Sequence, residues 1–262
     1  MQLDGETRLI PIVGDPIAQV KSPALLTEQL AGRGLNAIVP PAHVAPADFD
    51  GFVATMKRTQ NVDGLVLTVP HKFAGVAHCD RLTPRAAFVG AVNVLRRAAD
   101  GAWEGDALDG EGYLAGIAGL GLDVSGRSVL LVGAGGAGSA IAFAFLDKGA
   151  ARLAIHDADT ARRDALVARL AERFGPRVAA GDADPTGFEV VANATPMGMK
   201  PGDPYPADVT KLGARPFVAC CITRPDPSPL VAAAREAGCA TMTGLGMFHG
   251  VADRMVAFFA GD

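Results

Sequence analysis

A glycine-rich segment in the middle of the chain carries the most specific chemical pattern. Gly133, Gly135 and Gly138 are spaced as G-x-G-x-x-G, after an apolar run and before a run of small residues typical of a helix. Such glycines let the backbone approach a pyrophosphate, and the N–H groups at the start of a helix bind its charge. The pattern predicts a dinucleotide site with contacts at Gly133, Gly135, Gly136 and Ala137.

An acidic residue stands where such a site needs one. Asp157 follows a predicted strand at residues 152–156, about twenty residues after the turn, where a carboxylate accepts hydrogen bonds from an adenosine ribose 2′-hydroxyl. A 2′-phosphate would meet a like charge, which favours NAD over NADP. Arg162 and Arg163 lie nearby and partly offset this preference, so NADP stays possible. The alternative interpretation is a tight strand-to-helix turn followed by a solvated aspartate at the start of a helix.

The elements that position this turn lie in an uncharged segment, residues 128–146. The segment is long enough to suggest a membrane span. Several glycines interrupt it, however, so a strand at 128–132, a turn and a helix at 137–148 explain it better.

Short apolar runs and amphipathic stretches alternate along the whole chain. Up to about residue 100 they favour a mostly parallel α/β sheet, and the pattern restarts after Gly105. The predicted strands cover 8–13, 37–39, 64–69, 91–97, 128–132, 152–156, 189–192 and 217–222. The predicted helices begin at 22, 46, 70, 110, 137, 159, 229 and 247. We therefore expect two α/β units.

Composition excludes several classes of protein. The chain has 262 residues, of which 49% are hydrophobic and 20% charged, which excludes a disordered chain. A net charge of −4 with 6% aromatic residues argues against nucleic-acid binding. The cysteines lack the spacing of metal ligands, so no metal site is expected. Charged residues precede the first apolar run, so no signal peptide is visible and a cytoplasmic location is expected.

Several short blocks follow one another in a specific order. They are G-D-P-I-A (14–18), K-S-P (21–23), G-L-V-L-T-V-P-H-K (64–72), G-A-V-N (90–93), G-D-A-L-D-G (105–110) and N-A-T-P-M-G-M (193–199). In this order and spacing they resemble the shikimate/quinate dehydrogenase family. The resemblance spans nearly the whole chain, from Gly14 to the last predicted helix.

The resemblance implies an N-terminal α/β substrate domain (1–104), completed by the last helix (244–262), and a Rossmann-type, doubly wound dinucleotide-binding domain (105–243). It also implies reversible hydride transfer between a nicotinamide cofactor and a ring alcohol, the chemistry of aromatic amino acid biosynthesis. The lysine and aspartate that act on the alcohol in this family correspond to Lys72 and Asp109. The block beside the nicotinamide corresponds to Asn193, Ala194, Thr195 and Met197.

The chemistry is consistent with that pair. Oxidising an alcohol requires a group that takes the hydroxyl proton, and a lysine can do this in a partly desolvated site. A neighbouring carboxylate can orient the ammonium and the hydroxyl. The chain has only six lysines, so a lysine would rarely stand at this position of the block by chance. The alternative is a surface lysine at a helix start and an aspartate in a turn.

The substrate contacts of the family are only partly kept. Ser22, Thr68 and Asn93 match it, whereas other residues stand at its usual polar positions, namely Val20, Val66, Ala107, Leu108, Thr223 and Val251. About five lost hydrogen bonds, at about 0.5–1.5 kcal/mol each, would weaken shikimate binding by several kcal/mol. We therefore expect a less hydroxylated, more apolar ring substrate. Ser22 either helps to dock an anionic group or only caps its helix.

Two other functions remain open. One is a nucleotide-binding regulator that has lost catalysis, and the other is a related dehydrogenase such as one acting on methylene-tetrahydrofolate. The retained Lys72 and Asp109 speak against the first, and the blocks at 68–72 and 193–199 against the second.

The chain is expected to be a monomer or a homodimer. We expect His71 and His78 to lie at the surface or to support the site from behind, and not to bind a metal. His249 is expected to be an ordinary partly buried histidine, with a substrate contact as the alternative, and Cys220 and Cys221 are expected in the core.

Overall fold

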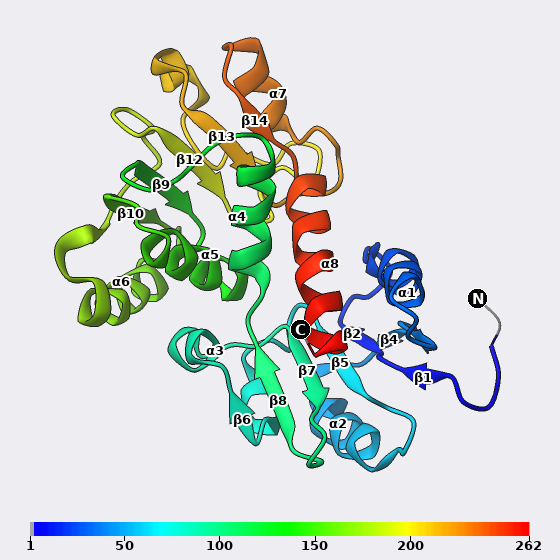
Figure 1. Ribbon diagram of the computed structural model, residues 1–262. Helices are drawn as coiled ribbons and strands as arrows, with labels where there is room; N and C mark the ends of the chain where they lie inside the picture. Colours follow the sequence, from blue (N-terminus) through cyan, green and yellow to red (C-terminus); the bar gives the residue numbers. More distant parts are fainter. Residues whose placement is uncertain (1–2, 262) are drawn as a thin grey trace. The chain divides into compact units, whose positions relative to one another are not determined.

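The computed structural model describes residues 3–261. It contains two compact units (Figure 1): one runs to Leu108 and resumes at Ala252, and the other is Asp109–Val251. The two boundaries between the units therefore fall at 108/109 and 251/252. Both lie further along the chain than the predicted boundaries at 104/105 and 243/244. Two contacts explain the difference. The Leu108 N–H donates to Asn93, which keeps the segment up to Leu108 in the first unit. Val251 packs so closely on Gly112 that a Cβ on this glycine would collide with it, which keeps the segment up to Val251 in the second unit.

The first unit is built on a six-stranded sheet with the order β4-β2-β5-β7-β8-β6. Its strands are β2 (Ile12–Gly14), β4 (Pro41–His43), β5 (Gly64–Leu67), β6 (Arg81–Leu82), β7 (Val94–Arg97) and β8 (Trp103–Asp106). The first predicted strand is in fact two, because β1 (Arg8–Leu9) pairs with β3 (Ala37–Ile38) in a separate sheet.

The mostly parallel sheet predicted for this unit is confirmed, because β2 is parallel to β4 and β5 and β6 is parallel to β8; β7 is the exception. This strand runs antiparallel to both β5 and β8. A tight turn at Asp100-Gly101 joins β7 to β8, with Gly101 at a φ of 85°. An Asp-Gly pair is a hairpin signal, and a hairpin makes neighbouring strands antiparallel.

The helices of the first unit are short, and two differ from expectation. They are α1 (Ser22–Gly32), α2 (Phe49–Arg58), α3 (Pro84–Val89), and the 3₁₀ helices η1 (Pro46–Asp48) and η2 (Ala74–His78). Ser22 is not the N-cap of α1, because Lys21 holds that position and Ser22 is the first helical residue. The helix predicted from Pro70 is a turn followed by η2.

The second unit has a wholly parallel six-stranded sheet with the order β11-β10-β9-β12-β13-β14. Its strands are β9 (Ser128–Val132), β10 (Arg152–His156), β11 (Val178–Ala180), β12 (Val190–Asn193), β13 (Phe217–Cys220) and β14 (Thr241–Met242). The strand order reverses at β9, which is the switch point of a doubly wound nucleotide-binding fold. The predicted Rossmann-type domain is therefore confirmed.

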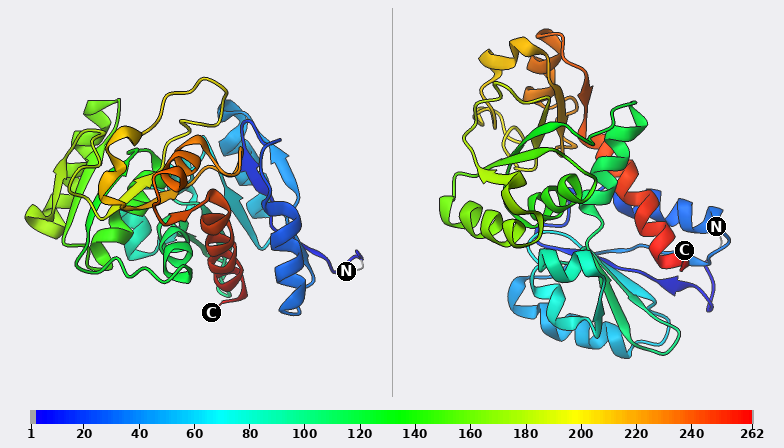
Figure 2. Two further views of the ribbon diagram at one scale, coloured as in Figure 1. Left: turned by 90° about the horizontal axis from the view of Figure 1, so that it is seen from above. Right: turned by 60° about the vertical axis from the view of Figure 1, so that its left-hand side comes forward.

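Helices flank this sheet on both sides (Figure 2), with α5 and α6 in green and α7 in orange. They are α4 (Asp109–Gly119), α5 (Gly136–Asp147), α6 (Thr160–Phe174), α7 (Pro229–Glu236), α8 (Gly244–Ala260), η3 (Gly175–Arg177) and η4 (Val209–Ala214). The Asp159 side chain accepts a hydrogen bond from the Arg162 N–H and caps α6, as predicted. Among residues 3–261, no helix has the length and apolarity needed to span a membrane.

Helices α4 and α8 touch backbone to backbone within the second unit. A Cβ on Gly250 would collide with the carbonyl oxygen of Gly112, and one on Gly112 would collide with Val251. A Cβ on Gly116 would likewise come within 2.8 Å of the Gly246 oxygen. Glycine is therefore required along this crossing for steric reasons.

Candidate functional site

The glycine turn after β9 has the geometry that the sequence predicts. Gly133 has a φ of 112°, a left-handed conformation that favours glycine, and its N–H donates to the His156 oxygen at 2.7 Å. A Cβ on Gly138 would collide with the Gly133 carbonyl oxygen, so the start of α5 packs directly on the turn. By contrast, a Cβ on Gly135, the N-cap of α5, would have no atom within 4 Å. The helix start therefore opens into free space.

A cavity of about 470 Å³ lies against this turn. The predicted residues that line it are Gly133, Gly135, Asp157, Ala194, Thr195 and Met197. Sequence reasoning did not assign others that line it, including His156, Ala158, Ala183, Pro196, Tyr205 and Pro206. Its volume and the open N-terminus of α5 suit an adenosine with a pyrophosphate.

Asp157 is 5% exposed and lies at the floor of this cavity. Its Oδ2 accepts from the Ala134 N–H at 2.7 Å, and its Oδ1 accepts from the Asp159 N–H at 2.9 Å. Arg162 donates to both oxygens, from Nη2 at 2.7 Å and from Nε at 3.3 Å. The four acceptor positions of the carboxylate are therefore occupied by the protein itself.

The charge state of this pair follows from these contacts. Burial raises the pKa of Asp157, but the hydrogen bonds from Arg162, Ala134 and Asp159 outweigh it and bring the pKa below the ordinary value of 3.8. The same ion pair raises the pKa of Arg162. The Arg162 side chain remains 50% exposed. Asp157 is thus a fixed anion, whereas Arg162 has one side open to the cavity and the solvent.

Asn193 supports the loop after β12. It is fully buried, and its Oδ1 accepts from the Thr195 hydroxyl at 2.7 Å and from the Thr195 N–H at 3.0 Å. The Thr195 hydroxyl oxygen in turn accepts from the Met197 N–H at 3.2 Å. Asn193 therefore shapes the loop that lines the cavity and does not itself line it.

In the first unit, polar residues gather at one edge of the sheet. Strands β5 and β8 both end at this edge, and β7 begins there, because β7 is antiparallel to both. Thr68 and Lys72 follow β5, and Asn93 precedes β7. The Leu67 N–H donates to the Asn93 oxygen at 2.8 Å, and the Val92 N–H donates to the Lys72 oxygen at 2.9 Å. Backbone hydrogen bonds thus fix the positions of Lys72 and Asn93 along this edge.

The segment that leads to Asp109 is fixed at the same edge. The Asn93 N–H donates to the Asp106 oxygen at 2.9 Å, and Asn93 Oδ1 accepts from the Leu108 N–H at 2.8 Å. Asp106 Oδ1 also accepts from the Thr83 hydroxyl at 2.6 Å. Asp109 is the next residue of the chain after Leu108 and is 7% exposed. The turn before Asp109 is therefore rigidly held by buried polar groups.

Several proteins are similar to this chain in sequence over most of their length. Residues 12–95 match the family model "shikimate dehydrogenase substrate binding domain". A shikimate dehydrogenase (NADP(+)) of Rubrobacter xylanophilus is 37% identical over 93% of this chain and 87% of its own. One of Geobacter metallireducens is 32% identical over 100% of this chain and 94% of its own. The chain belongs to the shikimate dehydrogenase family. The predicted resemblance, and with it the prediction of an enzyme acting on a CH–OH group, is confirmed.

Solved structures of this family have the same fold. Shikimate 5-dehydrogenase from Listeria monocytogenes, in complex with shikimate and NAD, has a TM-score of 0.90 at 25% identity, covering 100% of this chain and 94% of its own. Quinate dehydrogenase from Corynebacterium glutamicum, in complex with NAD, scores 0.87 at 28% identity, with coverages of 98% and 94%. A 5-ketofructose reductase of Gluconobacter sp. scores 0.87 at 27% identity, also with 98% and 94%.

The residues predicted at the family's polar positions are buried or half-buried, and Thr223 is half-buried. Val66, Ala107 and Leu108 are all buried, at 5% exposure or less. Val251 lies against Gly112, and Val20 is half-buried in the turn before α1. Thr68 and Ser22 are half-buried, and the Thr68 methyl group lies against Gly14.

The three histidines lie in different surroundings. His71 is not at the surface, which was one of its two predicted places: it is 2% exposed, its ring stacks on Phe49 at 4.3 Å, and its Nε2 lies 2.8 Å from the Val44 oxygen. His78 lies 2.8 Å from a carboxylate oxygen of Asp50. His249 is exposed rather than partly buried. Cys220 is fully buried, as predicted, whereas Cys221 is only half-buried.

Proposed function

We propose that the chain is a nicotinamide-dependent dehydrogenase that reversibly oxidises a ring alcohol, either shikimate, quinate or a less hydroxylated cyclic analogue. Lys72 and Asp109 handle the hydroxyl proton. The observation that carries the proposal is the sheet edge of the first unit, where Thr68, Lys72, Asn93 and the segment 106–108, directly before Asp109, are held by hydrogen bonds of the backbone and of the Asn93 side chain. Names of relatives in the same family, which include shikimate and quinate dehydrogenases, support it.

The residues around the glycine turn fit a dinucleotide. The free space at Gly135 accommodates a pyrophosphate, and Gly136 and Ala137 supply helix N–H groups to it. When bound, the nicotinamide ring supplies the hydride acceptor for the alcohol carbon. Ala194, Thr195 and Met197 form the loop proposed to lie beside that ring, and Asn193 keeps the loop in shape.

Lys72 and Asp109 act on the hydroxyl group. In the oxidation direction the Lys72 amine accepts the hydroxyl proton, and in reduction the ammonium returns it to the carbonyl oxygen. The Asp109 carboxylate accepts a hydrogen bond and orients both the substrate and the ammonium. The rigid turn between Asp106 and Asp109 limits the movement of this carboxylate, which favours transfer within hydrogen-bond distance.

The substrate is proposed to be less hydroxylated than shikimate. Ser22, Thr68 and Asn93 remain as polar contacts, whereas Val20 and Val251 offer only apolar ones. A hydroxyl placed against an aliphatic side chain loses its water without gaining a partner, which costs about 1–3 kcal/mol. The 5-ketofructose reductase with the same fold supports the idea that substrate choice varies among such proteins.

NAD is proposed as the preferred cofactor, with NADP also accepted. The Asp157 carboxylate repels a 2′-phosphate, which favours NAD. Arg162, half-exposed and lining the cavity, is the group that would neutralise a 2′-phosphate if it turned away from Asp157. The NADP(+) in the names of the curated relatives supports acceptance of the phosphorylated cofactor.

The proposal is tested by a screen of cyclic hydroxy acids, including shikimate and quinate, in which NADH formation is followed by absorbance. With the best substrate, Lys72→Ala and Asp109→Asn should each lower kcat by about 100-fold to 10,000-fold. NAD binding, measured by calorimetry, should not change in Lys72→Ala. Lys148→Ala, which removes an exposed lysine at the end of α5, is the matched control.

Two outcomes would contradict the proposal. If no ring alcohol is turned over while NAD binds tightly, the chain is a nucleotide-binding regulator. If Lys72→Ala turns over as fast as Lys148→Ala, the proton is handled by another group.

A further inference from the structure

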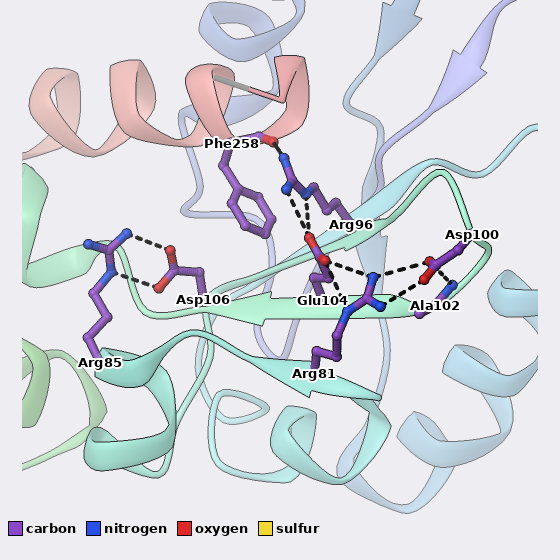
Figure 3. A network of polar contacts seen from close by, with 8 residues as sticks. All are labelled: Arg81, Arg85, Arg96, Asp100, Ala102, Glu104, Asp106 and Phe258. Atoms are coloured by element: carbon purple, nitrogen blue, oxygen red, sulfur yellow. Dashed lines mark hydrogen bonds and ion pairs between the residues drawn. The ribbon is translucent and has the colours of Figure 1, made fainter.

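A second cavity, of about 630 Å³, lies within the first unit, on the sheet face over β8 and β6. Arg81, Arg85, Arg96 and Arg254 all line it, together with Glu104 and Asp106. These residues come from β6, α3, β7, α8 and β8, which are distant in the sequence. Figure 3 shows the polar network at its base.

The base of the cavity is a cross-strand ladder. Glu104 is paired in register with Arg81 on one side and with Arg96 on the other. Its carboxylate lies 2.9 Å from Arg81 Nη2 and 2.8 Å from Arg96 Nη2. Asp106, two residues along β8 and therefore on the same face, is held by Arg85 at 2.7 and 2.5 Å (Figure 3). Arg81 also pairs with Asp100 at 2.8 Å. Three carboxylates thus neutralise three of the guanidinium groups.

Arg254 differs from the other three arginines. It is exposed on α8, lines the cavity, and has no carboxylate within 4.0 Å among residues 3–261. Its neighbour Asp253 accepts a hydrogen bond from Gln29 instead. The cavity therefore has one guanidinium whose charge is not compensated by a salt bridge.

The remaining wall is apolar and partly aromatic. It consists of Leu82, Leu108, Ala257 and Phe258, together with Thr83, whose hydroxyl donates to Asp106. The Arg96 guanidinium lies 4.7 Å from the centre of the Phe258 ring and donates to the Phe258 carbonyl oxygen at 2.7 Å. This contact, drawn in Figure 3, fixes the end of α8 and with it the position of Phe258, which lines the cavity.

We propose that this cavity is a second binding site, one that takes a small organic monocarboxylate with a planar apolar body. Arg254 pairs with the carboxylate, and Phe258, Leu82 and Leu108 contact the body. A dianion fits less well, because Glu104 and Asp106 repel a second negative charge and their arginines are already engaged. Lys72, Thr68 and Ser22 do not line the cavity, so the proposal is independent of the catalytic role given to them above.

Benzoate is the probe that tests this site, with binding to the full chain measured by calorimetry in the absence of nicotinamide cofactor. We expect saturable binding that Arg254→Gln weakens at least about tenfold, because a charge-assisted hydrogen bond is lost. Ala257→Phe, which fills the cavity from α8, should abolish binding while the melting temperature reports that the fold is kept. Inorganic phosphate should bind more weakly than benzoate.

Arg58→Gln is the matched control, because it removes the same charge from an exposed position on α2 of the same unit. It should leave benzoate affinity within about twofold, since an exposed charge is screened at this range. Lys72→Ala should do the same. The proposal is overturned if benzoate shows no saturable binding, if Arg254→Gln and Arg58→Gln have equal effects, or if Lys72→Ala removes binding.

Discussion

In the proposed function, the choice between NAD and NADP depends on the Asp157–Arg162 ion pair, and a single substitution at Arg162 tests this proposal. Its guanidinium occupies both oxygens of Asp157 yet is 50% exposed beside the cavity at the glycine turn. Arg162→Gln removes the cation that would meet a 2′-phosphate and releases acceptor positions on Asp157. The substitution should therefore weaken NADP and spare NAD.

The size of the effect follows from the exposure of the side chain. A hydrogen bond to a charged group contributes about 1.5–3 kcal/mol, and solvent screening of a half-exposed pair reduces this to about 1–2 kcal/mol. With about 1.4 kcal/mol for each factor of ten, kcat/KM for NADP should fall about 5-fold to 30-fold. The value for NAD should change by less than about threefold, because the freed Asp157 oxygens can accept from the ribose hydroxyls.

Initial rates with each cofactor at saturating substrate give the two kcat/KM values. Arg163→Gln is the control: this neighbouring arginine donates to Asp164 and does not line the cavity, so the NAD/NADP ratio should not move. A parallel loss of both cofactors in Arg162→Gln would show that the arginine only supports the fold. A shift of the ratio toward NADP would refute the assigned role of the pair.

Three further predictions concern local structure. Gly138→Ala should lower the free energy of unfolding, measured with urea, by about 1–3 kcal/mol, because the new Cβ would collide with the Gly133 oxygen. Gly135→Ala should leave the free energy of unfolding unchanged and should lower the affinity for NAD, measured by calorimetry. Equal stability losses would contradict this difference. The pKa of Asp157 is lower in the folded chain than the ordinary value of 3.8, so its ionised form stabilises the folded state above pH 3.8. This stabilisation is lost as the pH falls through the pKa that Asp157 has in the folded chain. Unfolding and NAD titrations should therefore show no transition from this group between about pH 5 and 8, and a midpoint above 4 would be inconsistent with the ion pair. Burial raises the pKa of Cys79 to about 11. The rate at which iodoacetamide alkylates Cys79, measured by mass spectrometry, should therefore rise about tenfold per pH unit up to about pH 10. A rate that levels off near pH 9 would disprove the raised pKa.

The nucleotide-binding unit was largely predictable because its signals are local. The boundaries of β9 and β10 match the predicted strands, and α6 begins after its Asp159 cap. A strand, a glycine turn and a helix lie in direct succession, so sequence spacing alone places them. The short strands β11 and β14 were missed, because two or three residues carry no measurable periodicity.

The first unit was less predictable because its order depends on pairing between distant segments. The antiparallel β7 and the edge strand β6 follow from sheet register, although the Asp100-Gly101 pair was an available hairpin signal. The sequence left two places open for His71, at the surface or behind the site, since nothing local indicates that its ring stacks on Phe49. The cavity lined by Arg81, Arg96 and Arg254 has no sequence signature at all, because tertiary structure alone brings these positions together.

The contact between α4 and α8 has a practical consequence for engineering. Asp109 begins the nucleotide-binding unit and Val251 ends it, and Gly112 lies against Val251. Both ends of this 109–251 stretch are therefore neighbours in space, which is the condition under which a domain can be excised, circularised or inserted into a host loop. The segment is accordingly suited to transferring dinucleotide binding to another protein, provided that the glycines at the contact between α4 and α8 are kept.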